Sequence, residues 1–343
     1  MINRPVPETA NSMSLAGKKV LITGGLGFIG SNLAHRCLEA GAHVTIYDNL
    51  DPHAGGTLYN IHDIKSSIEL HFQDLLDFDA LVKQVYERDI VFNCAASTSH
   101  PLSMREPWFD LDVNSRGVVN VLEALRRFNK QAKLVHLGTS TQLGPLQYEP
   151  ADENHPEFPT DIYSANKSAS EKYVLVYARA YGLPATVIRL PNVFGPRATI
   201  RSAEFTFNNY FVGLALQDKE ITVYGEGEQL RNVVYVDDAV TAMIMAALSE
   251  KSTGQTFFAA GDHHYSVADI AATTVRCMGA GKVRHIPWPQ DRKSVEIGNA
   301  IISNAKIKRT LGWEPVCSLE DGLRRTRAYF EDCLSEYLPG GRH

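Results

Sequence analysis

Short apolar runs alternate with longer amphipathic stretches between residues 18 and 189. The runs are rich in valine and isoleucine and predict buried strands that read KVLIT, HVTIYD, DIVFNCA, KLVHLG and ATVIRL. Helical periodicity between them predicts helices at 28–40, 77–87, 107–129 and 162–181. Strands that alternate with helices form βαβ units, and right-handed crossovers then give an α/β fold, a doubly wound parallel sheet of the Rossmann type.

The alternation breaks down after Arg189. Residues 191–202 read PNVFGPRATIRS, a Pro- and Gly-containing exit from the sheet, and residues 231–250 predict a strand and a helix that return to it. The remainder, with a final amphipathic helix at 318–337, predicts a smaller, irregular α+β lobe. The expected division is a disordered lead at 1–17, a sheet domain at 18–190 plus about 231–262, and a C-terminal lobe at 191–230 plus about 263–338.

Composition and charge narrow the range of partners. The chain has 343 residues, a net charge of −5 and no basic run, which argues against nucleic acid or an anionic membrane as a partner. Its five cysteines are scattered without CxxC spacing, so we expect neither a metal site nor disulfides. No apolar run is long enough to span a membrane and the N-terminus lacks the apolar segment of a signal peptide, so a cytoplasmic protein is expected.

A glycine-rich turn lies between the first predicted strand and the first predicted helix. It reads TGGLGFIG and contains Gly24, Gly27 and Gly30. Glycine lets the backbone approach a pyrophosphate closely, and the N-terminus of the following helix stabilises the phosphate charge. The next strand ends in Asp48, eighteen residues after Gly30, where a carboxylate accepts hydrogen bonds from an adenosine ribose and repels a 2′-phosphate. The pattern therefore predicts NAD rather than NADP as the cofactor.

Residues at other predicted strand ends extend this site. Asp74 in FQDLLD and the pair Ala95–Ala96 lie on the same edge of the sheet and fit a path from adenine to nicotinamide. The residues that we expect to contact the cofactor from these segments are Gly24, Gly27, Phe28, Ile29, Gly30, Asp48, Asn49, Asp74, Leu75, Ala95 and Ala96.

Tyr163 is the only one of the fourteen tyrosines that has a lysine four residues later, Lys167. On a helix the two side chains share a face. An ammonium ~5 Å away favours the phenolate by roughly 3 kcal/mol, or ~2 pKa units, and the nicotinamide charge adds to this. The phenol then becomes a usable base near pH 7. The segment KLVHLGTSTQLG supplies three hydroxyls, Thr139 to Thr141, one of which could bridge the tyrosine and a substrate oxygen.

These motifs together resemble the NAD-dependent epimerase/dehydratase family of extended short-chain dehydrogenases, and most of all its nucleotide-sugar 4-epimerases. The resemblance runs from about residue 18 to 330 and is carried by TGGLGFIG, YDN, AA, DVNSRGVVNVLEA, GTSTQLG, YSANK, RLPNVFGPR, GEGEQLRNVVYVDD and LGWEP. It implies Tyr163 as the base, Lys167 on the nicotinamide ribose and Thr139 as the hydroxyl member. By the same resemblance the sheet domain binds NAD and the C-terminal lobe binds a nucleotide sugar.

The resemblance also implies roles for residues other than Thr139, Tyr163 and Lys167. Asn114 is expected beside the active-site lysine, and the segment Pro191, Asn192 and Val193 is expected near the nicotinamide or the sugar. Arg231 and Arg292 are expected to clamp the substrate diphosphate, because a guanidinium binds phosphate in bidentate geometry. A homodimer through helices 107–129 and 162–181 is implied as well, although the apolar positions Val118, Val121, Leu122 and Leu125 could equally be internal core.

Four residues in three segments depart from the family pattern. The usual Arg-Asp after the GxGxQ loop is Arg231-Asn232, and Ser303 replaces the Asp expected before LGW. Family members that remove water across C5 and C6 carry Asp-Glu directly after the active-site threonine, and the decarboxylases tend to carry Glu at the second position. This chain has Ser140 and Thr141 there. Unperturbed hydroxyls do not transfer such protons at neutral pH, so both activities lose support.

The leading hypothesis is therefore an NAD-dependent nucleotide-sugar 4-epimerase. A nucleotide-sugar ketoreductase or dehydrogenase is the alternative among enzymes, and an NAD-binding scaffold without activity is the alternative outside them. His100, in the loop AASTSHPLSM, either faces the sugar or is an ordinary loop histidine. The sequence leaves the base, the sugar and the epimerised carbon open.

Overall fold

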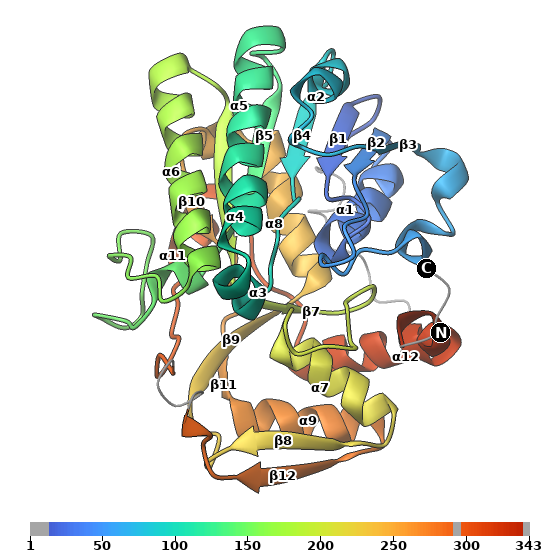
Figure 1. Ribbon diagram of the computed structural model, residues 1–343, viewed down its shortest axis with the longest axis vertical. Coiled ribbons are helices and arrows are strands. Elements are labelled where there is room, and N and C mark those ends of the chain that lie inside the picture. Colours follow the sequence, from blue (N-terminus) through green and yellow to red (C-terminus); the bar gives the residue numbers. More distant parts are fainter. Residues whose placement is uncertain (1–13, 291–295, 339–343) are drawn as a thin grey trace.

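A seven-stranded parallel sheet forms the centre of the larger part of the computed structural model, which describes residues 14–290 and 296–338. The strand order is β10-β6-β5-β4-β1-β2-β3 (Figure 1), so the order reverses between β1 and β4. The strands are β1 Lys19–Thr23, β2 His43–Asp48, β3 Glu69–Phe72, β4 Ile90–Asn93, β5 Lys133–Thr139, β6 Ala185–Leu190 and β10 Thr256–Phe258. This is the predicted doubly wound sheet, and the prediction of the Rossmann fold is confirmed.

Helices cover both faces of the sheet, which explains why its central strands are buried and mostly apolar. One face packs against α2 Phe78–Val85, α5 Gly117–Phe128 and α6 Ile162–Tyr181 (Figure 1). The other face packs against α1 Phe28–Glu39 and α8 Val236–Leu248. Neighbouring residues of one strand enter different cores: Leu21 of β1 packs under α5 and Ile22 under α1.

The helix predicted at 107–129 is interrupted. The chain forms α3 His100–Arg105, α4 Pro107–Leu111 and a π-helical turn at Asp112–Arg116 before α5 begins. The apolar positions proposed for a dimer interface, Val118, Val121, Leu122 and Leu125, are each at most 1% exposed within the core between α5 and the sheet. They are internal core, and any interface on this helix must use other residues.

A smaller lobe lies below the carboxyl ends of the strands in Figure 1. Its short strands are β7 Asn192–Phe194, β8 Glu220–Tyr224, β9 Leu230–Tyr235, β11 His264–Ser266 and β12 Lys282–Ile286. Its helices are α7 Phe207–Leu216, α9 Val267–Met278 and α12 Leu319–Tyr337, whereas α11 Ala305–Leu311 packs beside the edge strand β10 of the large sheet (Figure 1). The irregular second lobe is as predicted.

Two expectations about chain boundaries differ from the structure. The strand predicted at the start of 231–250 does not return to the large sheet, because β9 pairs with β7 and β11. Its helix α8 does return, and the three-residue strand β10 then adds to the sheet beside β6. The lead expected to be disordered through residue 17 is ordered at its end, where Leu15 is fully buried and donates its N–H to the Ala40 carbonyl.

No helix in 14–290 or 296–338 has the length and apolar character needed to cross a membrane.

Candidate active site

A cleft of about 290 Å³ opens at the carboxyl ends of the strands, where the strand order reverses. Its walls are the turn after β1, the ends of β2, β4 and β5, the start of α6, and the segment that leads into the small lobe. Ligands of open α/β sheets bind at such a reversal, because the loops from the two neighbouring strands diverge there.

The glycine turn forms the part of the cleft nearest α1. A side chain at Gly24 or Gly30 would lie within 2.6 Å of backbone atoms, so both glycines are needed for the turn and for helix packing. A side chain at Gly27 would meet only the Gly24 carbonyl at 3.3 Å, so this α-carbon faces the open cleft. Gly27 is the N-cap of α1, whose first turn carries neither a side-chain cap nor an acidic residue. The turn therefore fits a pyrophosphate at the helix N-terminus.

Asp48 holds the turn and faces the same cleft. Its two carboxylate oxygens accept the backbone N–H groups of Leu26 at 2.9 Å and Leu50 at 2.8 Å. Burial raises the pKa of Asp48, and these two hydrogen bonds act against that rise. Each oxygen keeps a second lone pair, so the carboxylate can also accept hydrogen bonds from ribose hydroxyls. Asn49 and Asp74 also line this end of the cleft, and the Asn49 amide donates a hydrogen bond to the Asp74 carboxylate at 2.8 Å.

Tyr163 and Lys167 lie one turn apart at the start of α6 and both line the cleft. Lys167 donates to the Leu137 carbonyl at 2.5 Å, which fixes its amine at the end of β5. Burial lowers the pKa of Lys167 to about 8, although Cys94, Asp110 and Glu171 act to raise it. Burial also raises the pKa of Tyr163, and the Thr139 hydroxyl acts to lower it. The sequence does not show this burial. The charges of Lys167 and the nicotinamide must therefore offset the desolvation of the phenolate before Tyr163 can act as a base.

A chain of polar groups runs from Thr139 along the wall of the cleft. The Thr139 and Thr141 hydroxyls are 3.1 Å apart, and Ser164 donates to the Thr141 hydroxyl at 3.0 Å. Ser164 also contacts Asp161 at 3.2 Å, and Asp161 accepts from His100 Nδ1 at 2.7 Å. His100 lines the cleft, so the structure favours the alternative in which it faces the ligand.

The sequence-predicted residues divide into those that meet at the cleft and those that do not. The ones that line it are Gly24, Gly27, Phe28, Ile29, Gly30, Asp48, Asn49, Asp74, Leu75, Ala95, Ala96, Thr139, Tyr163, Lys167, Pro191, Asn192 and Val193. Asn114 lies behind the wall, where its amide donates to the Ser97 carbonyl at 2.8 Å. Arg231 pairs with Glu296 at 2.7 Å and with the Gly298 carbonyl. Arg292 lies outside the described residues.

Sequence reasoning missed Asp110, which is fully buried on α4 near Tyr163 and Lys167. One carboxylate oxygen accepts the Asn166 amide at 2.9 Å, and the other has no hydrogen-bond partner among the residues described. Its negative charge raises the pKa of both Tyr163 and Lys167. The segment PWFDLD gave no signal of this placement, because a polar residue in a predicted amphipathic helix is normally assigned to the solvent face.

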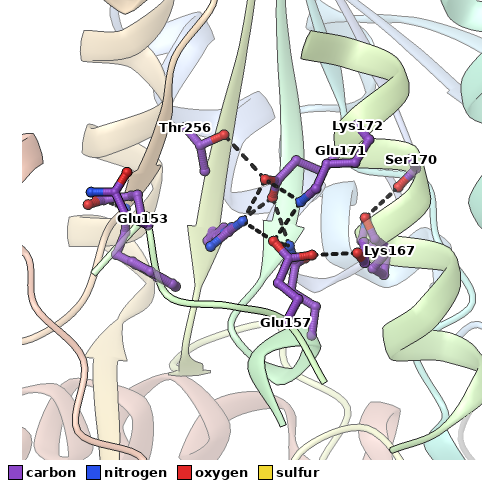
Figure 2. A network of polar contacts seen from close by, with 12 residues as sticks. Glu153, Glu157, Lys167, Ser170, Glu171, Lys172 and Thr256 are labelled. Carbon is purple, nitrogen blue, oxygen red and sulfur yellow. Dashed lines mark hydrogen bonds and ion pairs between the residues drawn. The ribbon is translucent and has the colours of Figure 1, made fainter. Parts of the chain in front are cut away.

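A network of buried charges contacts α6 one turn further along the helix (Figure 2). Arg189 of β6 is 2% exposed and makes two hydrogen bonds to Glu171 of α6, at 2.7 and 2.6 Å. Arg189 also donates to Glu157 at 2.6 Å, and Lys172 bridges both carboxylates from the surface. Glu171 lies one turn after Lys167, so this network fixes the helix that carries Tyr163 and Lys167.

The chain is similar in sequence and fold to several enzymes named for nucleotide sugars. The family model described as GDP-mannose 4,6 dehydratase matches residues 21–326. UDP-glucuronic acid decarboxylase 1 of Xenopus tropicalis is 30% identical over 336 residues, covering 94% of this chain and 75% of that protein. UDP-glucose 4-epimerase of Thermotoga maritima, solved with UDP-glucose, superposes with a TM-score of 0.83 at 29% identity and covers 92% of this chain and 99% of its own. UDP-glucose 4-epimerase of Thermus thermophilus, solved with NAD, gives a TM-score of 0.81 at 28% identity with 92% and 99% coverage.

Proposed function

The chain belongs to the GDP-mannose 4,6 dehydratase family, within the NAD-dependent epimerases and dehydratases, and from that membership we propose that it is an NAD-dependent nucleotide-sugar 4-epimerase. One observation carries the choice of reaction: Thr139, Tyr163 and Lys167 meet at the cleft, and the two residues after Thr139 are the hydroxyls Ser140 and Thr141. Dehydratases of the family carry an Asp-Glu pair at those positions and decarboxylases tend to carry Glu at the second, whereas 4-epimerisation uses the tyrosine as its acid–base group.

Each residue of the cleft has a defined part in this proposal. The glycine turn, Asp48 and Lys167 would hold NAD, which would supply the reversible hydride acceptance that oxidation and reduction at C4 of the sugar require. Tyr163 accepts the proton of the C4 hydroxyl, Thr139 orients that hydroxyl, and Lys167 favours the phenolate. The small lobe, entered through Asn192, holds the nucleotide and lets the keto sugar turn.

The test uses the purified protein with a panel of UDP-, dTDP-, GDP- and CDP-hexoses and no added cofactor. An epimerase carries its NAD, seen by absorbance after denaturation, and interconverts the two C4 epimers of one member. Formation of a 4-keto-6-deoxy sugar at an enzymatic rate contradicts the proposal. Net reduction of a keto sugar that consumes added dinucleotide would instead support a ketoreductase.

Asp48 is expected to set the preference for NAD over NADP. Wild-type protein should bind NAD⁺ about 10- to 100-fold more tightly than NADP⁺, because hydrogen bonds to a charged group contribute about 1.5–3 kcal/mol and the carboxylate repels a 2′-phosphate. Asp48→Asn should weaken NAD⁺ binding and narrow the difference. Dissociation constants of both dinucleotides measure this, and equal or tighter NADP⁺ binding by the wild type contradicts it.

We also propose a homodimer through the outer faces of α5 and α6. The observation in its favour is that Phe128, Tyr173 and Val176 are 47%, 39% and 55% exposed on these helices. Val176→Arg is expected to shift the mass in light scattering from two chains to one, because a buried unpaired charge opposes association. A wild-type mass of one chain at every concentration rules the dimer out.

A further inference from the structure

His100 forms a hydrogen-bonded pair with Asp161 directly beside the catalytic tyrosine. The His100 Nδ1 to Asp161 Oδ2 distance is 2.7 Å, and the imidazole packs edge-on against the Tyr163 ring with centroids 4.8 Å apart. Both rings line the cleft. This places a second proton-transfer group next to the tyrosine that takes the sugar hydroxyl proton.

The partners of each atom define what the pair can do. Asp161 is the N-cap of α6 and accepts from the Ser164 N–H at 2.8 Å, so its carboxylate is fixed. Burial alone would raise the pKa of Asp161, but the hydrogen bond and charge of His100 hold it below its ordinary value. A carboxylate on Nδ1 makes Nδ1 the donor and leaves Nε2 as the basic nitrogen. Within residues 14–290 and 296–338, Nε2 has no hydrogen-bond partner, and the His100 side chain is 37% exposed at the cleft.

From this geometry we propose that His100, held by Asp161, is a second acid–base group that exchanges the proton on a sugar carbon adjacent to the transient C4 ketone. The inference rests on the proposed function only for the origin of the ketone. It assigns the cleft a further activity, which is α-proton exchange at C3 or C5. The hydroxyls of Ser140 and Thr141 cannot perform this proton transfer, so it requires His100.

The step balances without any oxidant beyond NAD, which forms the ketone. His100 Nε2 takes the proton from the α-carbon, the C–H electron pair forms a carbon–carbon double bond, and the carbonyl electrons move to O4. Tyr163, which by then carries the C4 hydroxyl proton, donates a hydrogen bond to the enolate oxygen. Asp161 stabilises the imidazolium in the way that a carboxylate does in other acid–base pairs. Return of a proton from Nε2 restores the C–H bond, and the half-exposed ring exchanges its own proton with solvent.

The experiment is deuterium incorporation in D₂O by the holoenzyme, followed by NMR at C3, C4 and C5. One arm uses the panel of nucleotide hexoses, and a second arm supplies a ketone directly as dTDP-4-keto-6-deoxyglucose. Wild-type protein should place deuterium at C3 or C5 well above the rate without enzyme. His100→Asn, which keeps an N–H donor toward Asp161 but has no group at the Nε2 position, should lower that rate by about 10²–10⁴-fold.

Two further variants separate catalysis from structure. Asp161→Asn keeps an oxygen acceptor for the N-cap of α6 but removes the charge, so exchange should fall while the protein stays folded. His43→Asn, at an exposed position at the far end of β2, should exchange like the wild type.

The outcomes decide between the two proposals independently. C4 inversion by the wild type without deuterium at C3 or C5 in either arm overturns this inference and leaves the 4-epimerase standing. Exchange of the supplied ketone without C4 inversion supports the inference and contradicts the 4-epimerase. Equal exchange by wild type and His100→Asn also overturns the role of His100, and no exchange with any substrate overturns the inference.

Discussion

Tyr163→Phe is expected to reduce turnover by about 10²–10⁴-fold while the protein keeps its NAD, because one positioned acid–base group contributes this much. The substitution removes the phenolic oxygen and leaves the ring, which is 8% exposed and packs against His100. The glycine turn and Asp48, which we expect to hold the cofactor, do not contact this oxygen. Single-turnover rates and the absorbance of released NAD measure the two quantities separately.

Lys167→Met is the matched variant on the same helix face. It removes the charge that favours the phenolate and the amine expected on the nicotinamide ribose, so NAD affinity and rate should fall together. A Tyr163→Phe enzyme with near wild-type turnover would show that the assigned catalytic centre is wrong. It would also restore support for an NAD-binding scaffold without activity.

The sequence predicted the large sheet because its central strands are buried on both faces and are therefore mostly apolar. β1 and β6 follow this rule and were recognised. β10 was not, because three residues provide no periodicity and its place depends on pairing with β6. The assignment of β9 to the large sheet was wrong. An apolar run indicates that a strand is buried, but it does not indicate which strands it pairs with.

The site was predictable where local geometry constrains the residue type. Gly24 and Gly30 leave no space for a side chain, and Tyr163 and Lys167 are one helical turn apart, so spacing and the order of strands and helices around it marked them as candidates. Contacts between distant segments were not predictable. The pair between His100 and Asp161 joins residues sixty-one positions apart, and the burial of Asp110 depends on how α4 packs against α6. Burial also reverses the expected direction of the Tyr163 pKa, which no spacing rule includes.

Arg189→Met is expected to lower the free energy of unfolding by about 3–5 kcal/mol, because removing one partner of a buried ion pair leaves the other charge uncompensated. Glu171, labelled in Figure 2, is 1% exposed and receives two hydrogen bonds from the Arg189 guanidinium. Urea unfolding followed by circular dichroism measures the loss. NAD binding should weaken too, since Glu171 and Lys167 belong to the same helix.

Lys172→Met provides the control within the same network. Its amine contacts Glu157 and Glu171, but its side chain is 49% exposed, so the loss should stay below about 1 kcal/mol because water screens exposed ion pairs. Adding Glu171→Gln to Arg189→Met should recover part of the stability, since the double variant no longer buries an unpaired carboxylate. Equal losses from Arg189→Met and Lys172→Met would mean that burial does not govern this network. A double variant less stable than Arg189→Met would show that Glu171 packs independently of its partner.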